Sequence, residues 1–221
     1  MLCATDLWKE TYPGASAGYL VLGNVSNPDC CESLEESKRK LEAKLRTRFL
    51  RKDDLSLDPA MAAYSNYYKR HKKTYHVLQQ LESIIFKGKS IPRVAGLVEA
   101  MFMAELKNGL LTAGHDYAAL QGSLLLDVAA GDESYVLINK REQLAKAGDM
   151  KMSDSRGMIS SVIHGPDFRT RIVPETKKVV FTVYAPSGIS QQAVANHLTD
   201  IYAFVKQCAP DTAIESQGVV G

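Results

Sequence analysis

The stretch IPRVAGLVEAMFMAELKNGLLTAGHD, residues 91–116, marks the point where the sequence changes from helical to extended patterning. Its apolar residues recur at helical spacing, which predicts one buried face of a helix that begins near Ile91-Pro92. The residues of this face are Val94, Leu97, Val98, Met101 and Phe102. Asn108-Gly109 predicts the end of the helix, because glycine accepts the left-handed backbone of a C-cap.

Helical patterns dominate the residues before this stretch, after one apolar strand expected at AGYLVLGNV (17–25). Helix starts are indicated by N-cap residues and by proline in the first turn, and helix ends by glycine. These rules predict three helices: one opened by a capping box of Ser33 and Glu36, one from Asp58-Pro59 to about Lys72, and one from Thr74 to Gly88.

Extended patterns follow from residue 120 onward. Turn residues separate short β-rich runs, which predicts strands at SLLLDVA, SYVLI, GMISSVI, TRIV and KVVFTVYA. A last amphipathic helix is expected over Gln191 to Cys208, and the polar segment after Pro210 is expected to fray. Helices grouped in the first half, a mixed or antiparallel sheet in the second and a closing C-terminal helix define an α+β class. One domain is expected over residues 1–221, ordered over about 12–208 with a tail at 209–221.

The composition restricts the class of protein. With 45% hydrophobic residues, the 221-residue chain can bury a core. The 27 Lys and Arg nearly balance the 25 Asp and Glu, so any polyanion site must be regional. No apolar run is long enough for a membrane span and no signal peptide is recognisable, which predicts a cytoplasmic protein without a membrane partner. The spacing of Cys3, Cys30, Cys31 and Cys208 matches no disulfide framework and predicts reduced thiols.

Common catalytic and metal-binding fingerprints are absent from the sequence. There is no GxGxxG, no HExxH, no GxSxG and no phosphate-binding loop of the GxxxxGK type. The cysteines form no CxxC pair either. We therefore expect neither a cofactor nor a metal.

Three blocks of sequence occur in a recognisable order. The first is YPGASAGYLVLGNVSN, an aromatic-Pro-Gly followed by a strand and an Asn-containing turn. The second is AYSNYYKRHKKTYHVLQQLESIIFKGKSIPRVAGLVEAMFMAELKNGLLTAGHDYAAL, and the third is GDMKMSDSRGMISSVIHGPDFRTRIVPETKKVVFTVYA. Together they resemble the solo B3/B4 domain family, stand-alone relatives of the B3/B4 domain of the phenylalanyl-tRNA synthetase beta chain. The resemblance covers residues 12 to about 208.

The resemblance implies a tRNA-related function, because the synthetase domain removes tyrosine wrongly esterified to phenylalanine tRNA. It also implies a cavity between Glu99–Asp116 and Met158–Thr176. The candidate catalytic residues, which would orient a water or the substrate amine, are Glu99, His115 and His164. The candidate substrate-binding residues are Asp116, Asp167, Arg169, Arg171, Glu175 and Thr176.

Several positions depart from the family pattern. Ala95-Gly96 and Phe102 stand where relatives commonly carry Asn-Pro and another Asn, and Val162-Ile163-His164 replaces a Trp-bearing segment. Ala113 or Gly114 stands where the synthetase has its pocket histidine. These departures predict a more apolar cavity with weak or absent hydrolysis.

Simpler alternatives exist for the pocket candidates. His115-Asp116 could be a catalytic dyad or only a turn in which Asp116 caps the next residues. His164 could belong to the pocket or only end a strand. Asp167, Arg169 and Arg171 alternate like one strand face, either as a surface ion-pair ladder or as a strip that contacts phosphate.

The run YYKRHKKTYH (67–76) is the clearest candidate for polyanion binding. Cations bind phosphate, and aromatic faces can stack on bases. The alternative is a solvated helix end, where cations complement the helix dipole. The candidate RNA-binding residues are Tyr67, Lys69, Arg70, Lys72, Lys73, Lys87, Lys89 and Arg93.

Three functions compete at this point. The first is an RNA-binding B3/B4 module with tRNA as its partner and an altered editing pocket, which could also take an amino-acid-like small molecule. The second is a stand-alone hydrolase that deacylates mischarged aminoacyl-tRNA. The third is a small-molecule or protein-interaction domain that kept the fold without the RNA. One domain of this size leaves no room for a complete synthetase.

Overall fold

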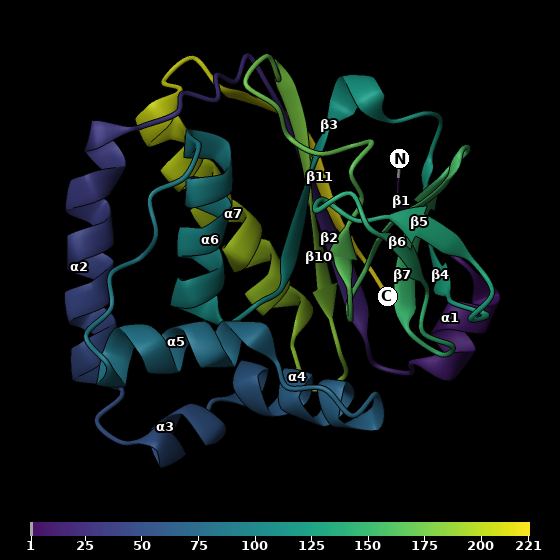
Figure 1. Cartoon of the computed structure of the whole chain (residues 1–221), viewed down its shortest axis with the longest axis horizontal. Coiled ribbons are helices and arrows are strands. Elements are labelled where there is room, and N and C mark those ends of the chain that lie inside the picture. The colour runs from purple at the N-terminus through teal and green to yellow at the C-terminus, as the bar shows by residue number, and fades with distance from the viewer. Residues whose placement is uncertain (1) are drawn as a thin grey trace.

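A four-stranded sheet lies at the centre of the protein, with helices on one face and a second sheet on the other (Figure 1). The computed structural model describes residues 2–221. The central sheet has the order β11-β2-β10-β3, and each neighbouring pair is antiparallel. Its strands are β2 (Ser16–Gly23), β3 (Thr112–Asp116), β10 (Lys178–Ala185) and β11 (Ala213–Val220). The predicted α+β class is confirmed.

The second sheet has the order β1-β4-β7-β8-β9. Its strands are β1 (Leu2–Ala4), β4 (Leu124–Val128), β7 (Met150–Asp154), β8 (Gly157–Ser161) and β9 (Gly165–Pro166). Only β1 and β4 pair in parallel. A two-stranded hairpin stands beside it, formed by β5 (Ser134–Val136) and β6 (Glu142–Leu144).

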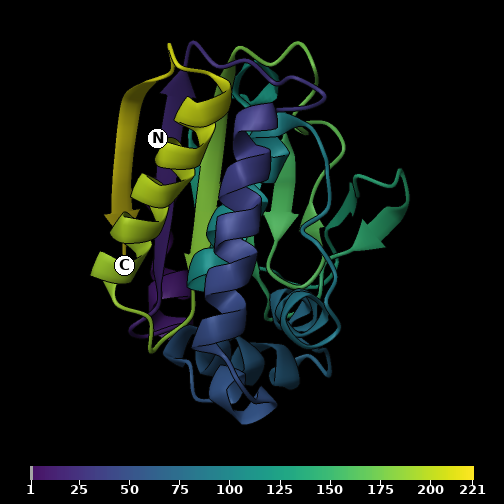
Figure 2. The same ribbon diagram turned by 90° about the vertical axis from the view of Figure 1, so that its left-hand side faces the viewer.

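The helical layer has two levels. Helices α6 (Gly96–Asn108) and α7 (Gln191–Cys208) lie next to the central sheet, and α2 (Glu32–Arg48) lies outside them (Figure 2). Gly18 of β2 allows this close approach, since a Cβ there would lie 2.5 Å from Val194 Cγ1. The remaining helices are α1 (Asp6–Thr11), α3 (Lys52–Ser56), α4 (Pro59–Arg70), α5 (His76–Phe86) and the 3₁₀ turn η1 (Tyr117–Ala119). None of the helices in the described part of the chain combines the length and the apolar character that a membrane span requires.

Several predicted helix ends are confirmed. Asp58 accepts hydrogen bonds from the Ala60 and Met61 amides, with Pro59 at the start of α4. Gly109 ends α6 in the left-handed conformation, at φ 70°. Helix α7 has the predicted bounds.

The start of α6 differs from the prediction. The helix begins at Gly96, because the preceding segment runs extended along α2. The Ile91 amide donates to Glu42 Oε1 at 2.7 Å, and Arg46 Nη2 donates to the Lys89 carbonyl at 3.2 Å. These contacts hold the segment in an extended conformation, so a helical turn does not form there.

The predicted capping box of α2 is absent. Cys31 occupies the N-cap, and the Ser33 hydroxyl donates to the Gln207 carbonyl of α7 at 2.6 Å. A tertiary contact therefore replaces the local one.

The segment after Pro210 was expected to fray, and this is wrong. It forms β11, which pairs with β2 along most of its length. The described structure therefore continues well beyond residue 208.

The TRIV segment was expected to be a strand, and this is also wrong. Residues 167–173 form turns and single bridges, among them one between Arg171 and His115. Asp167, Arg169 and Arg171 consequently do not form an alternating strand face.

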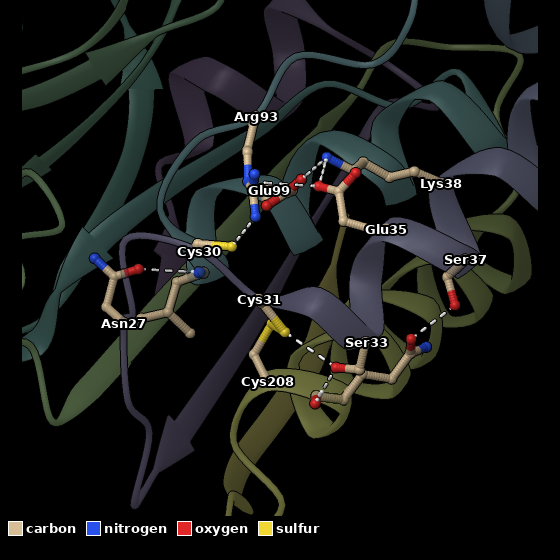
Figure 3. The surroundings of a disulfide bond; sticks show 12 residues. Asn27, Cys30, Cys31, Ser33, Glu35, Ser37, Lys38, Arg93, Glu99 and Cys208 are labelled. Atoms are coloured by element: carbon tan, nitrogen blue, oxygen red, sulfur yellow. Dashed lines mark hydrogen bonds and ion pairs between the residues drawn. A yellow bond between two sulfur atoms is a disulfide. The ribbon is translucent and has the colours of Figure 1, made fainter.

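The expectation of reduced thiols is wrong for one pair of cysteines. Cys31 and Cys208 form a disulfide that joins the start of α2 to the end of α7, with Cα atoms 5.6 Å apart (Figure 3). Cys3 and Cys30 are free and exposed. Disulfides that close long loops commonly contribute about 2–5 kcal/mol, so this bond is a substantial clamp on the helical layer.

Candidate nucleic-acid interface

His115 and Asp116 do not form a dyad, which was one of the two alternatives for this pair. Successive side chains of a strand point to opposite faces, and the contacts of the two residues follow that rule. His115 is fully buried, with Nδ1 2.7 Å from Thr170 Oγ1. Asp116 accepts hydrogen bonds from the Ala118 amide at 2.9 Å and from Thr176 Oγ1 at 2.8 Å. Asp116 therefore caps a turn, as the simpler alternative predicted.

His115 belongs to a closed buried network. The Thr170 hydroxyl donates to Asp167, so it accepts from the Nδ1–H group of His115. Burial lowers the pKa of His115 to about 3, and the nearby Arg169 contributes to the same shift. The ring is consequently neutral near pH 7. Its Nε2 atom has no hydrogen-bond partner within residues 2–221, and the ring is fully enclosed, so a solvent-borne ester does not reach it.

Arg169 is occupied by an internal carboxylate. Nη1 and Nη2 each bind Asp154 at 2.9 Å, and Nη1 also donates to the Ala119 carbonyl. Burial raises the pKa of Asp154, but Arg169 together with the Gln121 and Arg156 amides outweighs it and holds that pKa below its ordinary value. Such a bidentate pair leaves the guanidinium little capacity for an external phosphate.

The other predicted pocket residues lie apart. Glu99 is buried in the helical layer, where it pairs with Lys38 of α2 (Figure 3). The Arg171 guanidinium stacks 3.7 Å from the centre of the Phe168 ring, and Glu175 is exposed. The structure thus brings together His115, Asp167 and Arg169, but it does not gather the candidate catalytic residues Glu99, His115 and His164 in one site.

The tyrosines of the 67–76 run are buried, so the expectation of exposed rings for base stacking is wrong. Tyr67 accepts from the Met150 amide at 2.7 Å and donates to Asp149 at 2.5 Å. Tyr68 donates to the Val162 carbonyl at 2.7 Å, and Tyr75 stays below the surface as well. The Tyr67 and Tyr68 rings attach α4 to the second sheet, whereas the Tyr75 hydroxyl donates to the Gly109 carbonyl at the end of α6.

The cations of the same run are exposed at the end of α4. Lys69, Arg70, Lys72 and Lys73 all face solvent. Their exposure leaves them accessible for the predicted phosphate contacts.

Lys146 and His164 join this helix end from distant parts of the chain. Burial lowers the pKa of His71, and the charges of Lys146, Arg70 and His164 lower it further. Burial likewise lowers the pKa of His164, together with Lys73 and Lys146. Arg70, Lys146 and His164 therefore lie within electrostatic reach of His71, and Lys73 and Lys146 lie within reach of His164. We call Arg70, His71, Lys73, Lys146 and His164 the basic cluster.

The remaining predicted RNA-binding cations lie elsewhere. Lys87, Lys89 and Arg93 belong to the extended segment that runs along α2, and Arg93 Nε lies 3.8 Å from Glu35 (Figure 3). The structure therefore divides the predicted cations into two separate groups.

Hollows flank the exposed side of α4. One, of about 480 Å³, is lined by Asn66, Tyr67 and Arg70 together with residues of the 11–13 loop. Another, of about 340 Å³, is lined by Lys69 and Lys73 and by the start of α5. Cations thus border concave surface on both sides of the helix.

Comparison with known proteins adds a likeness at the level of structure. No protein-family model matches the sequence, and no curated protein matches it. The fold is similar to that of a solved structure, an N-terminal fragment of the phenylalanyl-tRNA synthetase beta-subunit from Pyrococcus horikoshii, with a TM-score of 0.52 and 12% identity. The likeness is one of fold. The match covers 100% of this chain and 54% of the fragment, so the chain spans about half of its length.

This likeness supports the expected resemblance to the synthetase beta chain coarsely, and the B3/B4 assignment itself stays a prediction. Sequence reasoning missed Lys146 and His71 as partners of the cluster. No local pattern singles out Lys146, because only the fold places it near α4. Within residues 2–221, no three His, Cys, Asp or Glu side chains gather as a metal site.

Proposed function

We propose that the protein binds RNA, with tRNA as the ligand, through the basic cluster. The observation that carries this proposal is convergence: three separate segments of the chain contribute basic side chains to one surface at the end of α4. The net charge is only +2, so such a concentration is not a consequence of composition. The likeness to a synthetase beta-subunit fragment agrees with an RNA ligand but extends only to the fold.

The chemistry of the cluster suits a phosphate backbone. Lysine and arginine release condensed counterions when they bind phosphates, which gives affinity without sequence specificity. With the tyrosine rings buried, stacking contributes nothing, so binding should depend on charge and shape. A folded RNA with closely spaced phosphates matches a surface of this kind better than an extended single strand.

We propose binding rather than hydrolysis. The candidate catalytic side chains lie in different layers, and the most suggestive one, His115, is enclosed with its Nδ1–H group already donated to Thr170. The proposal places the protein in the cytoplasm, where thiols are kept largely reduced, so the Cys31–Cys208 bond would clamp the helical layer only in the oxidised form.

The experiment measures tRNA affinity by fluorescence anisotropy over a range of salt concentrations. The test variant is Arg70→Ala/Lys73→Ala/Lys146→Ala. For every phosphate that the variant no longer neutralises, the slope of log K against log salt should fall by roughly 0.7–0.9. We therefore expect much weaker binding and a slope lower by about two to three.

The matched control is Lys87→Ala/Lys89→Ala/Arg93→Ala, which removes the same charge from the other group of cations. It should bind nearly as the unaltered protein does. Equal weakening in the two variants would indicate a general charge effect, and unchanged binding in the test variant would refute the proposed interface. Circular dichroism verifies that both variants are folded.

A further inference from the structure

A separate hollow of about 270 Å³ opens between the two sheets, away from α4. Its floor is apolar. Leu2 and Leu124 come from the second sheet, and Val21 and Val180 come from the central sheet. None of its lining residues belongs to the basic cluster or to the candidate catalytic and substrate-binding residues. The hollow is therefore a separate candidate site.

The mouth of this hollow is polar and rich in hydrogen-bond donors. Lys178 Nζ lies 2.5 Å from Glu215 Oε2 and 3.7 Å from the centre of the Tyr117 ring. The Ser216 hydroxyl lies 3.4 Å from the Tyr19 hydroxyl. Glu215 supplies the only carboxylate among the residues that line the hollow.

A β-bulge in β11 places the Glu215 side chain at the mouth of the hollow. The register of β11 against β2 shifts between Ile214 and Ser216, which leaves Glu215 as the extra residue of a bulge. Bulges redirect side chains and are frequent beside binding sites. The Glu215 carboxylate lies against Gly23, where an added Cβ would meet it, so a larger residue at that position would require the Glu215 side chain to shift.

We propose that this hollow binds a small monocarboxylate with an apolar or aromatic body. The body lies on the apolar floor between the sheets, and the carboxylate replaces that of Glu215 on Lys178. Little energy opposes this exchange, because Lys178 loses one carboxylate partner and gains another, while the Glu215 side chain, 44% exposed, can turn to solvent. Tyr117, also 44% exposed, covers the mouth. The inference does not depend on RNA binding.

The exchange makes opposite predictions for the two charged residues. Lys178→Met should weaken binding at least tenfold, because the ligand carboxylate loses its cation. Glu215→Gln should strengthen binding several-fold, because the competing carboxylate is gone. Lys177→Met is the matched control, since Lys177 is an exposed neighbour that does not line the hollow, and it should leave the affinity unchanged.

The probe is indole-3-acetate, titrated into the full chain by isothermal calorimetry, with neutral indole-3-acetamide as the comparison. We expect saturable binding of the acid and at least tenfold weaker binding of the amide. Leu124→Trp should abolish binding by filling the floor, with a thermal melt as the folding control. The proposal is overturned by equal affinity for acid and amide, by binding that survives Lys178→Met, by weaker binding in Glu215→Gln, or by the absence of binding in the unaltered protein.

Discussion

His115 shows at the scale of one residue how burial decides chemistry. The chain of donors from His115 through Thr170 ends on Asp167, and burial raises the pKa of that carboxyl group. A histidine that is neutral and enclosed is a structural donor rather than a titrating catalyst. Its titration is nevertheless measurable through the stability of the fold.

We expect His115 to make the protein less stable as pH falls. Its folded-state pKa is about 3, while an unfolded histidine titrates near 6.5. Between these values the unfolded chain binds a proton that the folded chain does not. The free energy of unfolding therefore falls by about 1.4 kcal/mol per pH unit for this residue, and it is unaffected above the unfolded pKa.

The measurement compares urea unfolding of the unaltered protein and His115→Asn from about pH 7 to about pH 4.5. The unaltered protein should lose stability more steeply, by about 1.4 kcal/mol per pH unit. Only the difference is diagnostic, since Glu105, whose pKa burial raises to about 8, contributes in the opposite direction. Parallel pH profiles would show that the pKa of His115 in the folded protein is close to that in the unfolded chain.

Single residues also mark where sequence reasoning succeeded and failed. The caps at Asp58 and Gly109 were predictable because a cap is a local interaction. The burial of Tyr67 and Tyr68 was partly predictable, because Met61, Tyr64, Tyr67 and Tyr68 recur at helical spacing on one face of α4. The basic residues that follow them drew the interpretation towards an exposed surface.

Strand β11 carries the main lesson at the scale of elements. The sequence AIESQGVV lacks regular alternation and contains a bulge, so periodicity gives no indication of a strand. The strand forms by pairing with the outer edge of β2, whose backbone groups would otherwise be unpaired. Exposed apolar edges promote association between molecules, and β11 prevents this for β2.

Removing β11 tests that account. We expect a chain that ends at Pro210 to lose on the order of 2–5 kcal/mol of stability, since cross-strand pairs contribute roughly 0.2–1 kcal/mol each. It should also self-associate through the bare β2 edge, visible in size-exclusion chromatography. A frayed tail would behave differently, because the truncated chain would then remain monomeric with an unchanged free energy of unfolding in urea.

The basic cluster exists only at the scale of the whole molecule. Arg70, His71 and Lys73 are neighbours in sequence, but Lys146 and His164 reach them through the packing of α4 against the second sheet. Helix periods and turn residues predicted the α+β class because those patterns are local. The positions of long-range partners, including the Cys31–Cys208 bond, depend on tertiary packing that no local pattern encodes.

Photo-crosslinking tests most directly where RNA lies on the protein. A tRNA carrying 4-thiouridine is crosslinked to the protein at moderate salt, and the attached peptides are identified by mass spectrometry. The account predicts crosslinks in the end of α4, in the segment around Lys146 and in the turn at His164, all suppressed by Arg70→Ala/Lys73→Ala/Lys146→Ala. Crosslinks confined to the Lys87–Arg93 segment, or none above those of a protein that does not bind RNA, would contradict it.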